Sequence, residues 1–114
     1  QIVLVHGGGF LPYHVGRLDR AHVARPETRA DGAALPSGYL RRFHYDTLVQ
    51  FAPALKYLVD VVGADRVVLG SDHPFWLGDP APLGIVRQAR LAEPEERAIL
   101  GDNARRLFRL EAPR

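Results

Sequence analysis

Residues 2–9 of the chain read IVLVHGGG: four apolar residues, then a histidine and three glycines. An uninterrupted apolar strand is typical of a parallel sheet covered on both faces, whereas a half-exposed antiparallel strand alternates apolar and polar residues. The same pattern recurs at residues 67–69, and residues 43–48 form a shorter, more mixed candidate strand. The sequence therefore predicts three strands of a parallel sheet.

Helices are predicted between and after these strands. Residues 53–62 place four apolar residues at i, i+3, i+4 and i+7, and Gly63 can cap the end of that helix. Residues 15–23 are compatible with a helix, whereas residues 25–38 contain Pro26, Gly32 and Pro36 and are expected to form a long loop. Further helices are expected at residues 83–91, 94–100 and 103–110.

The alternation of strands and helices predicts parallel βα units. A (β/α)8 barrel uses about 250 residues for eight units, or roughly 31 for each. His6 and Asp72 stand about two such units apart, and a parallel sheet of three strands would leave two unpaired edges. We therefore expect an α/β fold: an incomplete (β/α)8 TIM barrel with about the last three βα units and the C-terminal helices. Residues 1–114 would be the C-terminal part of a single barrel domain.

Composition excludes several classes of protein. The chain has 46% hydrophobic and 25% charged residues, which is ordinary for a soluble globular domain. It has no cysteine, which excludes disulfides, thiol nucleophiles and zinc sites built on cysteine. The formal net charge of +2 favours no nucleic-acid partner. No apolar run approaches the ~20 residues that cross a bilayer, so neither a membrane partner nor export is expected, and the cytoplasm is the default location.

Two ionisable residues follow predicted strands. His6 comes directly after the first strand, and Asp72 comes shortly after the third. Active-site residues of barrels gather at the C-terminal ends of the strands, so we expect both to be functional. Asp72 could ligate a divalent cation or could cap the next helix or loop. His6 could act in catalysis or could only form a hydrogen bond within its loop.

Other readings of these residues have less support. Arg17 offers a planar fork for a carboxylate or phosphate, but sequence alone favours a surface arginine. His-Gly-Gly-Gly also builds the oxyanion hole of many esterases, but neither Ser37 nor Ser71 lies in the Gly-x-Ser-x-Gly motif that such enzymes need. A dinucleotide site fails because Pro12 occupies the position of the third glycine.

Taken together, the motifs resemble the C-terminal part of the amidohydrolase-related family of metal-dependent enzymes, and within it the branch of the aminocarboxymuconate-semialdehyde decarboxylases. The resemblance covers nearly the whole chain, and its specificity comes from the order and spacing of the motifs. They are HGGG (6–9), GR (16–17), LPSGY (35–39), YDTLV (45–49), VLGSDHPF (68–75) and GDNA (101–104).

The resemblance implies a role for each candidate residue. Asp72 would be a ligand of one divalent metal, usually zinc, and His6 would be the unligated histidine that takes a proton from water activated by that metal. Arg17 would reach into the site of a neighbouring subunit to hold a substrate carboxylate, which implies a homodimer. Phe75 would line the same pocket.

The family's other metal ligands, a His-x-His pair and a further histidine, are absent from this chain. We therefore expect residues 1–114 alone to bind no metal usefully and to be inactive. The leading interpretation is a metal-dependent decarboxylase of an unsaturated or aromatic carboxylic acid. One alternative is a hydrolase of an amide, ester or lactone in the same superfamily. The other is a non-catalytic barrel remnant that serves as a binding or oligomerisation module.

Overall fold

A computed structural model describes residues 1–29 and 34–110 of the chain. Its three strands are β1 (Val3–Leu4), β2 (His44–Asp46) and β3 (Val67–Val68). They form one sheet in the order β1-β2-β3, and both pairs are parallel. The three predicted strands and the parallel sheet of an α/β fold are therefore confirmed.

The segment between β1 and β2 is more helical than predicted. Helix α1 (Leu11–Ala24) begins before residue 15 because Pro12, which suits a first helical turn, stands close to its start. The predicted loop over residues 25–38 contains two 3-10 turns, at Pro26–Thr28 and within Pro36–Arg42. Residues 30–33 of that prediction lie outside the described residues.

Helix α2 (Ala52–Val62) joins β2 to β3 and confirms the predicted helix at 53–62. The four apolar residues at helical spacing, Leu55, Leu58, Val59 and Val62, are all buried. Gly63 ends the helix with φ 88°, a conformation that residues with a side chain rarely adopt. A 3-10 turn at Ala64–Arg66 then leads into β3.

The C-terminal region is helical, as predicted, but its boundaries differ. Helix α3 (Leu83–Gln88) ends before residue 91, and Arg90 turns the chain with φ 49°. Helix α4 (Glu93–Arg97) continues through a π-helical turn (Ala98–Asp102) into α5 (Asn103–Phe108). Arg109 adopts φ 55° and stops α5 before the predicted residue 110.

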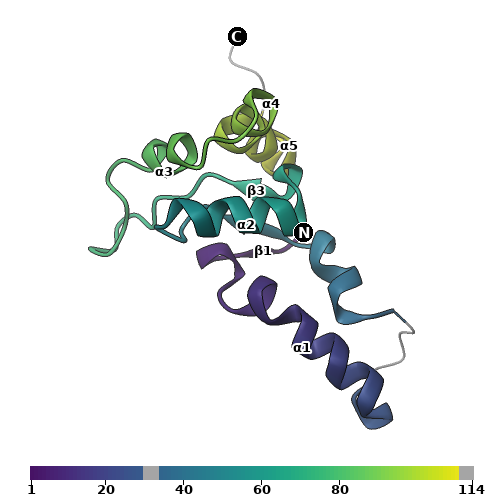
Figure 1. The fold of residues 1–114 in the computed structure, drawn as a ribbon. Helices are drawn as coiled ribbons and strands as arrows, with labels where there is room; N and C mark the ends of the chain where they lie inside the picture. The colour runs from purple at the N-terminus through teal and green to yellow at the C-terminus, as the bar shows by residue number, and fades with distance from the viewer. Residues whose placement is uncertain (30–33, 111–114) are drawn as a thin grey trace.

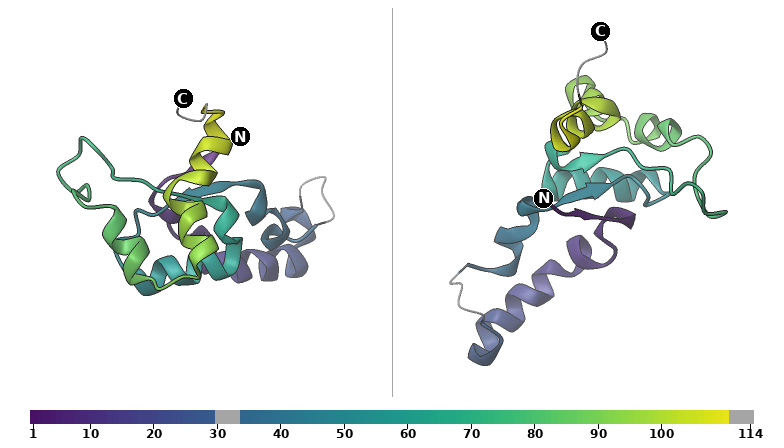
Figure 2. Two further views of the ribbon diagram at one scale, coloured as in Figure 1. Left: turned by 90° about the horizontal axis from the view of Figure 1, so that it is seen from above. Right: turned by 180° about the vertical axis from the view of Figure 1, so that it is seen from behind.

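The hydrophobic core lies between the sheet and the helices. Figure 1 shows α2 packed along one face of the sheet, and Figure 2 shows the sheet from behind, with no helix of the described residues lying across it. β1 is correspondingly half-buried rather than fully buried, because no strand of the described residues pairs with its outer edge. The core cluster contains Leu40, Tyr45, Leu55, Leu58, Val59, Val62, Val67, Ile85, Val86, Ala89 and Ile99.

The molecule is extended because α1 projects from the sheet (Figure 1). The radius of gyration is 15.5 Å, whereas a compact domain of this length would have about 13 Å. Only Pro12 is buried on α1, so most of this helix faces solvent. Within residues 1–29 and 34–110, no helix is long and apolar enough to cross a membrane.

Candidate active site

Three polar residues meet at the carboxyl ends of the three strands. His6 lies in a 3-10 turn (His6–Gly8) directly after β1, Asp46 is the last residue of β2, and Asp72 follows β3. Parallel strands bring their carboxyl ends to one edge of the sheet, which is where α/β enzymes place their active sites. The predicted pair, His6 and Asp72, is thus brought together.

His6 Nε2 lies 3.7 Å from Asp72 Oδ1, which is within range of an ion pair but too long for a hydrogen bond. The His6 side chain is 60% exposed, whereas that of Asp72 is more enclosed. Both residues have positive φ, 55° for His6 and 60° for Asp72. Left-handed conformations of this kind are uncommon outside glycine and cluster at functional sites.

These two residues open onto a hollow of about 440 Å³ lined by Val5, His6, Asp72, Phe75, Trp76 and Leu77. Its wall is therefore apolar and aromatic, with one imidazole and one carboxylate, which is the usual composition of a small-molecule site. Phe75 lines this hollow together with His6 and Asp72, and its contact with a substrate stays a prediction.

Arg17 lies away from this hollow. It is an exposed residue of the projecting helix α1, and it is not among the residues that line the pocket. No hydrogen bond or ion pair joins it to another residue within 1–29 and 34–110. The predicted donation of Arg17 to a neighbouring subunit is not tested by a single chain.

Sequence reasoning missed two residues at this site. Trp76 lines the hollow and is 91% exposed, more than any other large apolar residue of the described chain. Asp46 is buried and binds the loop after β1. The rule that singled out His6 and Asp72, a polar residue at the end of a strand, applies equally to Asp46.

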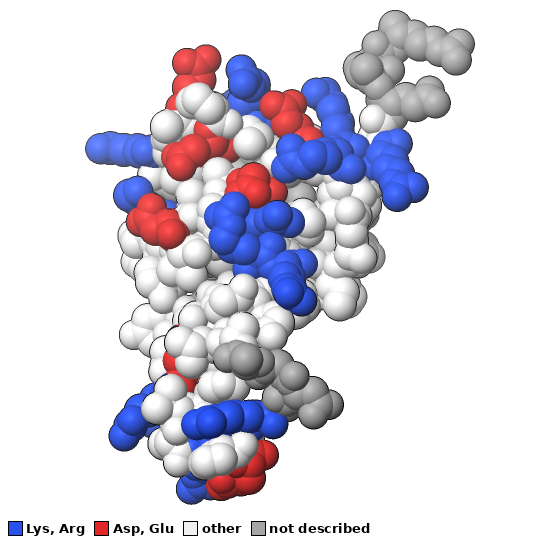
Figure 3. All heavy atoms as spheres, turned by 90° about the vertical axis from the view of Figure 1, so that its right-hand side faces the viewer, with Lys and Arg blue, Asp and Glu red and all other residues white. Residues whose placement is uncertain are grey.

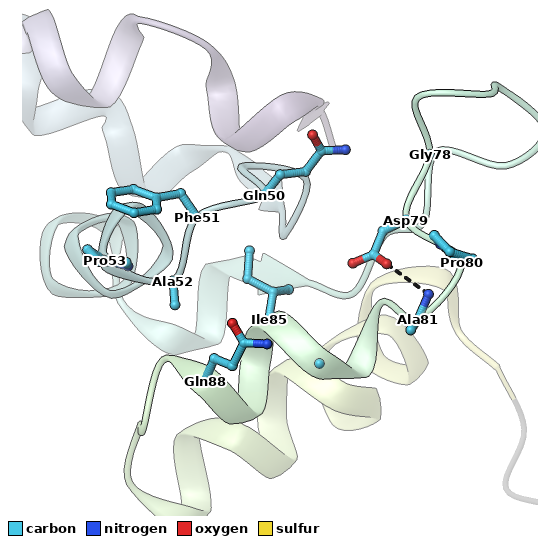
Figure 4. Close-up of a pocket in the computed structure, with 11 residues that line it drawn as sticks. Gln50, Phe51, Ala52, Pro53, Gly78, Asp79, Pro80, Ala81, Ile85 and Gln88 are labelled. Carbon is cyan, nitrogen blue, oxygen red and sulfur yellow. Dashed lines mark hydrogen bonds between the residues drawn. The ribbon is translucent and has the colours of Figure 1, made fainter.

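A second hollow, of about 560 Å³, lies between the start of α2, the 78–81 loop and α3 (Figure 4). Its only ionisable lining residue is Asp79, whose Oδ1 accepts a hydrogen bond from the Ala81 N–H at 2.8 Å. This carboxylate is engaged by its own loop, and no second ionisable residue lines the hollow. The hollow at His6 and Asp72 is therefore the better candidate for chemistry.

Basic side chains gather elsewhere, among acidic ones, on the side of the molecule shown in Figure 3. Asp65 forms ion pairs with Arg41 at 2.9 Å and with Arg66 at 3.2 Å.

Two buried residues of β2 have shifted pKa values. Burial, helped by the positive charges of Arg66 and Arg106, lowers the pKa of His44. Burial also raises the pKa of Tyr45, whose hydroxyl donates to the Leu40 carbonyl at 2.9 Å.

Asp72 and His6 are the two residues lining the hollow whose side-chain types can ligate a metal. Carboxylate oxygen and imidazole nitrogen both suit a divalent cation such as zinc or manganese. Among the described residues, however, no three His, Cys, Asp or Glu side chains form a group that could hold a metal ion. The chemistry of the donors thus fits part of a metal site.

Comparison with known proteins identifies the family of this chain. The model of the amidohydrolase family matches residues 1–110. The 2-amino-3-carboxymuconate-6-semialdehyde decarboxylase of Dictyostelium discoideum is 35% identical over 106 residues, which cover 91% of this chain and 30% of that protein.

Solved structures of decarboxylases are also similar. The 5-carboxyvanillate decarboxylase of Sphingomonas paucimobilis superposes with a TM-score of 0.85 at 32% identity, covering 97% of this chain and 34% of that one. The corresponding enzyme of Novosphingobium aromaticivorans, complexed with manganese and 4-hydroxy-3-methoxy-5-nitrobenzoic acid, gives 0.81 at 26% identity and covers 96% and 33%. The chain thus spans about a third of the length of the proteins it matches.

Proposed function

Because the chain belongs to the amidohydrolase family, we propose that it is the C-terminal part of a metal-dependent decarboxylase acting on an unsaturated or aromatic carboxylic acid. The observation that carries this proposal is the placement of His6 Nε2 3.7 Å from Asp72 Oδ1 in one hollow. The three similar proteins named above are decarboxylases of such acids, which supports this reaction.

A (β/α)8 barrel would complete the fold. The outer edge of β1 and one face of the sheet are not covered by the described residues, and both would be covered in a closed barrel. The similar proteins are about three times as long as this chain. We propose that the additional strands supply the remaining metal ligands.

A divalent metal would be held in part by Asp72. When bound, it would supply positive charge to the substrate's carboxylate and to charge that develops during the reaction. The family resemblance implies zinc, but manganese is the metal in the structure of the similar Novosphingobium enzyme. We propose that the protein uses one of these two ions.

Other side chains of this chain would deliver a proton and contact the substrate. Loss of carbon dioxide leaves a carbon that must receive a proton, and His6 could hold that proton at Nε2 and deliver it. Phe75 and Trp76 would contact the unsaturated or aromatic part of the substrate and exclude water from the hollow.

Arg17 would bind a second negative group. Its position on the exposed, projecting helix α1 suits a residue that reaches another molecule better than one that serves its own pocket. We propose a homodimer in which each subunit donates Arg17 to the partner's site, where the guanidinium would hold a substrate carboxylate.

The test uses the full-length gene product purified with Mn²⁺ or Zn²⁺. Carbon dioxide release is measured with 5-carboxyvanillate and with 2-amino-3-carboxymuconate-6-semialdehyde. We expect turnover of at least one acid, loss of it in Asp72→Asn, and a fall of about 10²- to 10⁴-fold in His6→Asn. Turnover should be retained in Asp60→Asn, which changes an exposed carboxylate on α2. Hydrolysis of a lactone without decarboxylation would support the hydrolase alternative, and a protein that binds no metal would support the non-catalytic one.

A further inference from the structure

Asp46 connects two loops of the candidate site through its carboxylate. The residue is only 5% exposed. Its Oδ2 accepts a hydrogen bond from the His6 N–H at 3.0 Å, and its Oδ1 accepts bonds from the N–H groups of Gly7 at 2.8 Å and Leu48 at 3.1 Å. One buried carboxylate at the end of β2 thus holds the turn that follows β1.

The turn after β1 needs such an anchor. His6 and Gly7 have φ values of 55° and 60°, and the left-handed region is unfavourable for a residue that carries a Cβ atom. In this conformation the two successive N–H groups point at the same carboxylate, one at each oxygen. Successive N–H groups of this kind bind anions in backbone nests. Without the carboxylate these two N–H groups would lose their partners and the turn could relax.

The imidazole of His6 has little else to fix it. Its side chain is 60% exposed, and within residues 1–29 and 34–110 its only polar contact is the 3.7 Å approach to Asp72. The direction of the side chain therefore depends on the backbone from which it projects. Because Asp46 holds that backbone, Asp46 also controls where Nε2 lies relative to Asp72 and the hollow.

We propose that Asp46 is a positioning residue that acts through His6: its carboxylate orients the His6 backbone so that the imidazole faces the reacting group. The proposal rests on the proposed function, because its main effect is read through turnover. It assigns Asp46 no contact with substrate or metal.

A double-mutant cycle in the full-length, Mn²⁺-loaded enzyme with 5-carboxyvanillate tests this. Asp46→Asn keeps the shape of the side chain but turns an NH₂ group or a weaker acceptor toward the two N–H groups. We expect kcat to fall about 10- to 100-fold, the size of effect that misplacing a reacting group by ~1 Å can have, with KM changed less than about threefold.

The decisive comparison is Asp46→Asn in a His6→Asn background. If Asp46 acts through His6, the second substitution lowers kcat by less than about twofold. A similar fall in both backgrounds would mean that Asp46 supports the fold generally, and wild-type kcat in Asp46→Asn alone would also overturn the proposal. Asp60→Asn, an exposed carboxylate of α2, is the matched control and should leave kcat unchanged.

A second measurement on the wild-type protein does not depend on turnover or on the stability of a variant. Hydrogen exchange read by NMR should show protected amides at His6 and Gly7, as expected for N–H groups bonded to a buried carboxylate. Exchange at the rate of free amides would overturn the proposal. If no acid is decarboxylated, the proposed function fails, and this exchange experiment still decides whether Asp46 holds the turn.

Discussion

Polar side chains at the two ends of the sheet are arranged differently. At the amino-terminal end of β3, Asn103 is 1% exposed, its amide donates to the carbonyls of Ala64 and Val67 at 2.7 Å each, and its oxygen accepts from Arg106. At the carboxyl end, the His6 imidazole is 60% exposed and makes only a long contact. Asn103 satisfies its polar atoms within the fold, whereas His6 directs its imidazole into a hollow.

This contrast distinguishes a side chain that serves stability, Asn103, from one that is free to serve chemistry, His6. A group with all its hydrogen bonds made inside the fold stabilises that fold but has nothing left to offer a substrate. A polar group held in an unfavourable backbone conformation and left exposed adds little stability. We therefore expect substitutions at the two ends to affect different quantities.

The largest effect should come from His6→Asn. Loss of a proton carrier in the full-length enzyme should lower kcat by about 10²- to 10⁴-fold. The melting temperature should change little, because the imidazole is exposed and makes no hydrogen bond to another described residue. Steady-state kinetics and thermal unfolding check both statements. A large loss of stability with kcat retained would mean that His6 serves the fold and not the reaction.

Asn103→Ala should show the opposite behaviour. It removes the buried amide that donates to the Ala64 and Val67 carbonyls and accepts from Arg106, which should lower the free energy of unfolding by about 3 kcal/mol. Kinetic constants of the protein that remains folded should stay near wild type. Urea denaturation measures the loss. Arg105→Ala is the control. It removes an exposed ion pair with Asp102, three residues earlier in the chain, and should leave the free energy of unfolding almost unchanged.

Trp76→Ala should separate substrate binding from catalysis at the carboxyl end of the sheet. An aromatic side chain that is 91% exposed contributes little to folding but can contact a substrate ring. We expect KM to rise about tenfold, equivalent to about 1.4 kcal/mol of binding, with kcat and the melting temperature nearly unchanged. Phe108→Ala on α5, another exposed aromatic residue, should leave KM as it is. Equal changes in KM for the two variants would mean that Trp76 does not contact the substrate.

The smallest effect should be a pH dependence of stability from His44. Burial lowers its pKa, so the folded state binds the proton less readily than the unfolded state. This contribution to stability is complete above the unfolded pKa of about 6.5 and is lost as pH falls toward the lowered folded pKa. Urea midpoints between pH 8 and 5 should decrease less on acidification in His44→Gln than in wild type. His73→Gln, at an exposed histidine, should follow the wild-type curve.

Most of this architecture could be predicted from the sequence, because patterns of apolar residues reflect burial. The spacing of four apolar residues predicted α2, and the apolar runs predicted β1 and β3. The start of α1 was missed because that helix buries only Pro12 and so carries little pattern. The π-helical turn before Asn103 leaves no periodic signal either.

The candidate site was predicted where position along a strand was informative. His6 and Asp72 were found because both follow apolar strands, and Phe75 followed from the resemblance. Asp46 was missed because its role lies in bonds to backbone N–H groups about 40 residues away in sequence, which no local pattern records. Trp76 was missed because only the folded loop shows that it lines the hollow.

The left-handed conformations of His6 and Asp72 also limit which amino acids these positions can accept. Glycine, asparagine, aspartate and histidine tolerate such a backbone, whereas valine and isoleucine do not. In a saturation survey, asparagine would therefore lose activity for chemical reasons alone, and a β-branched residue would lose it through distortion of the turn as well. The difference in activity between the asparagine variant and the β-branched variants would measure how much the left-handed backbone restricts the residue at each position.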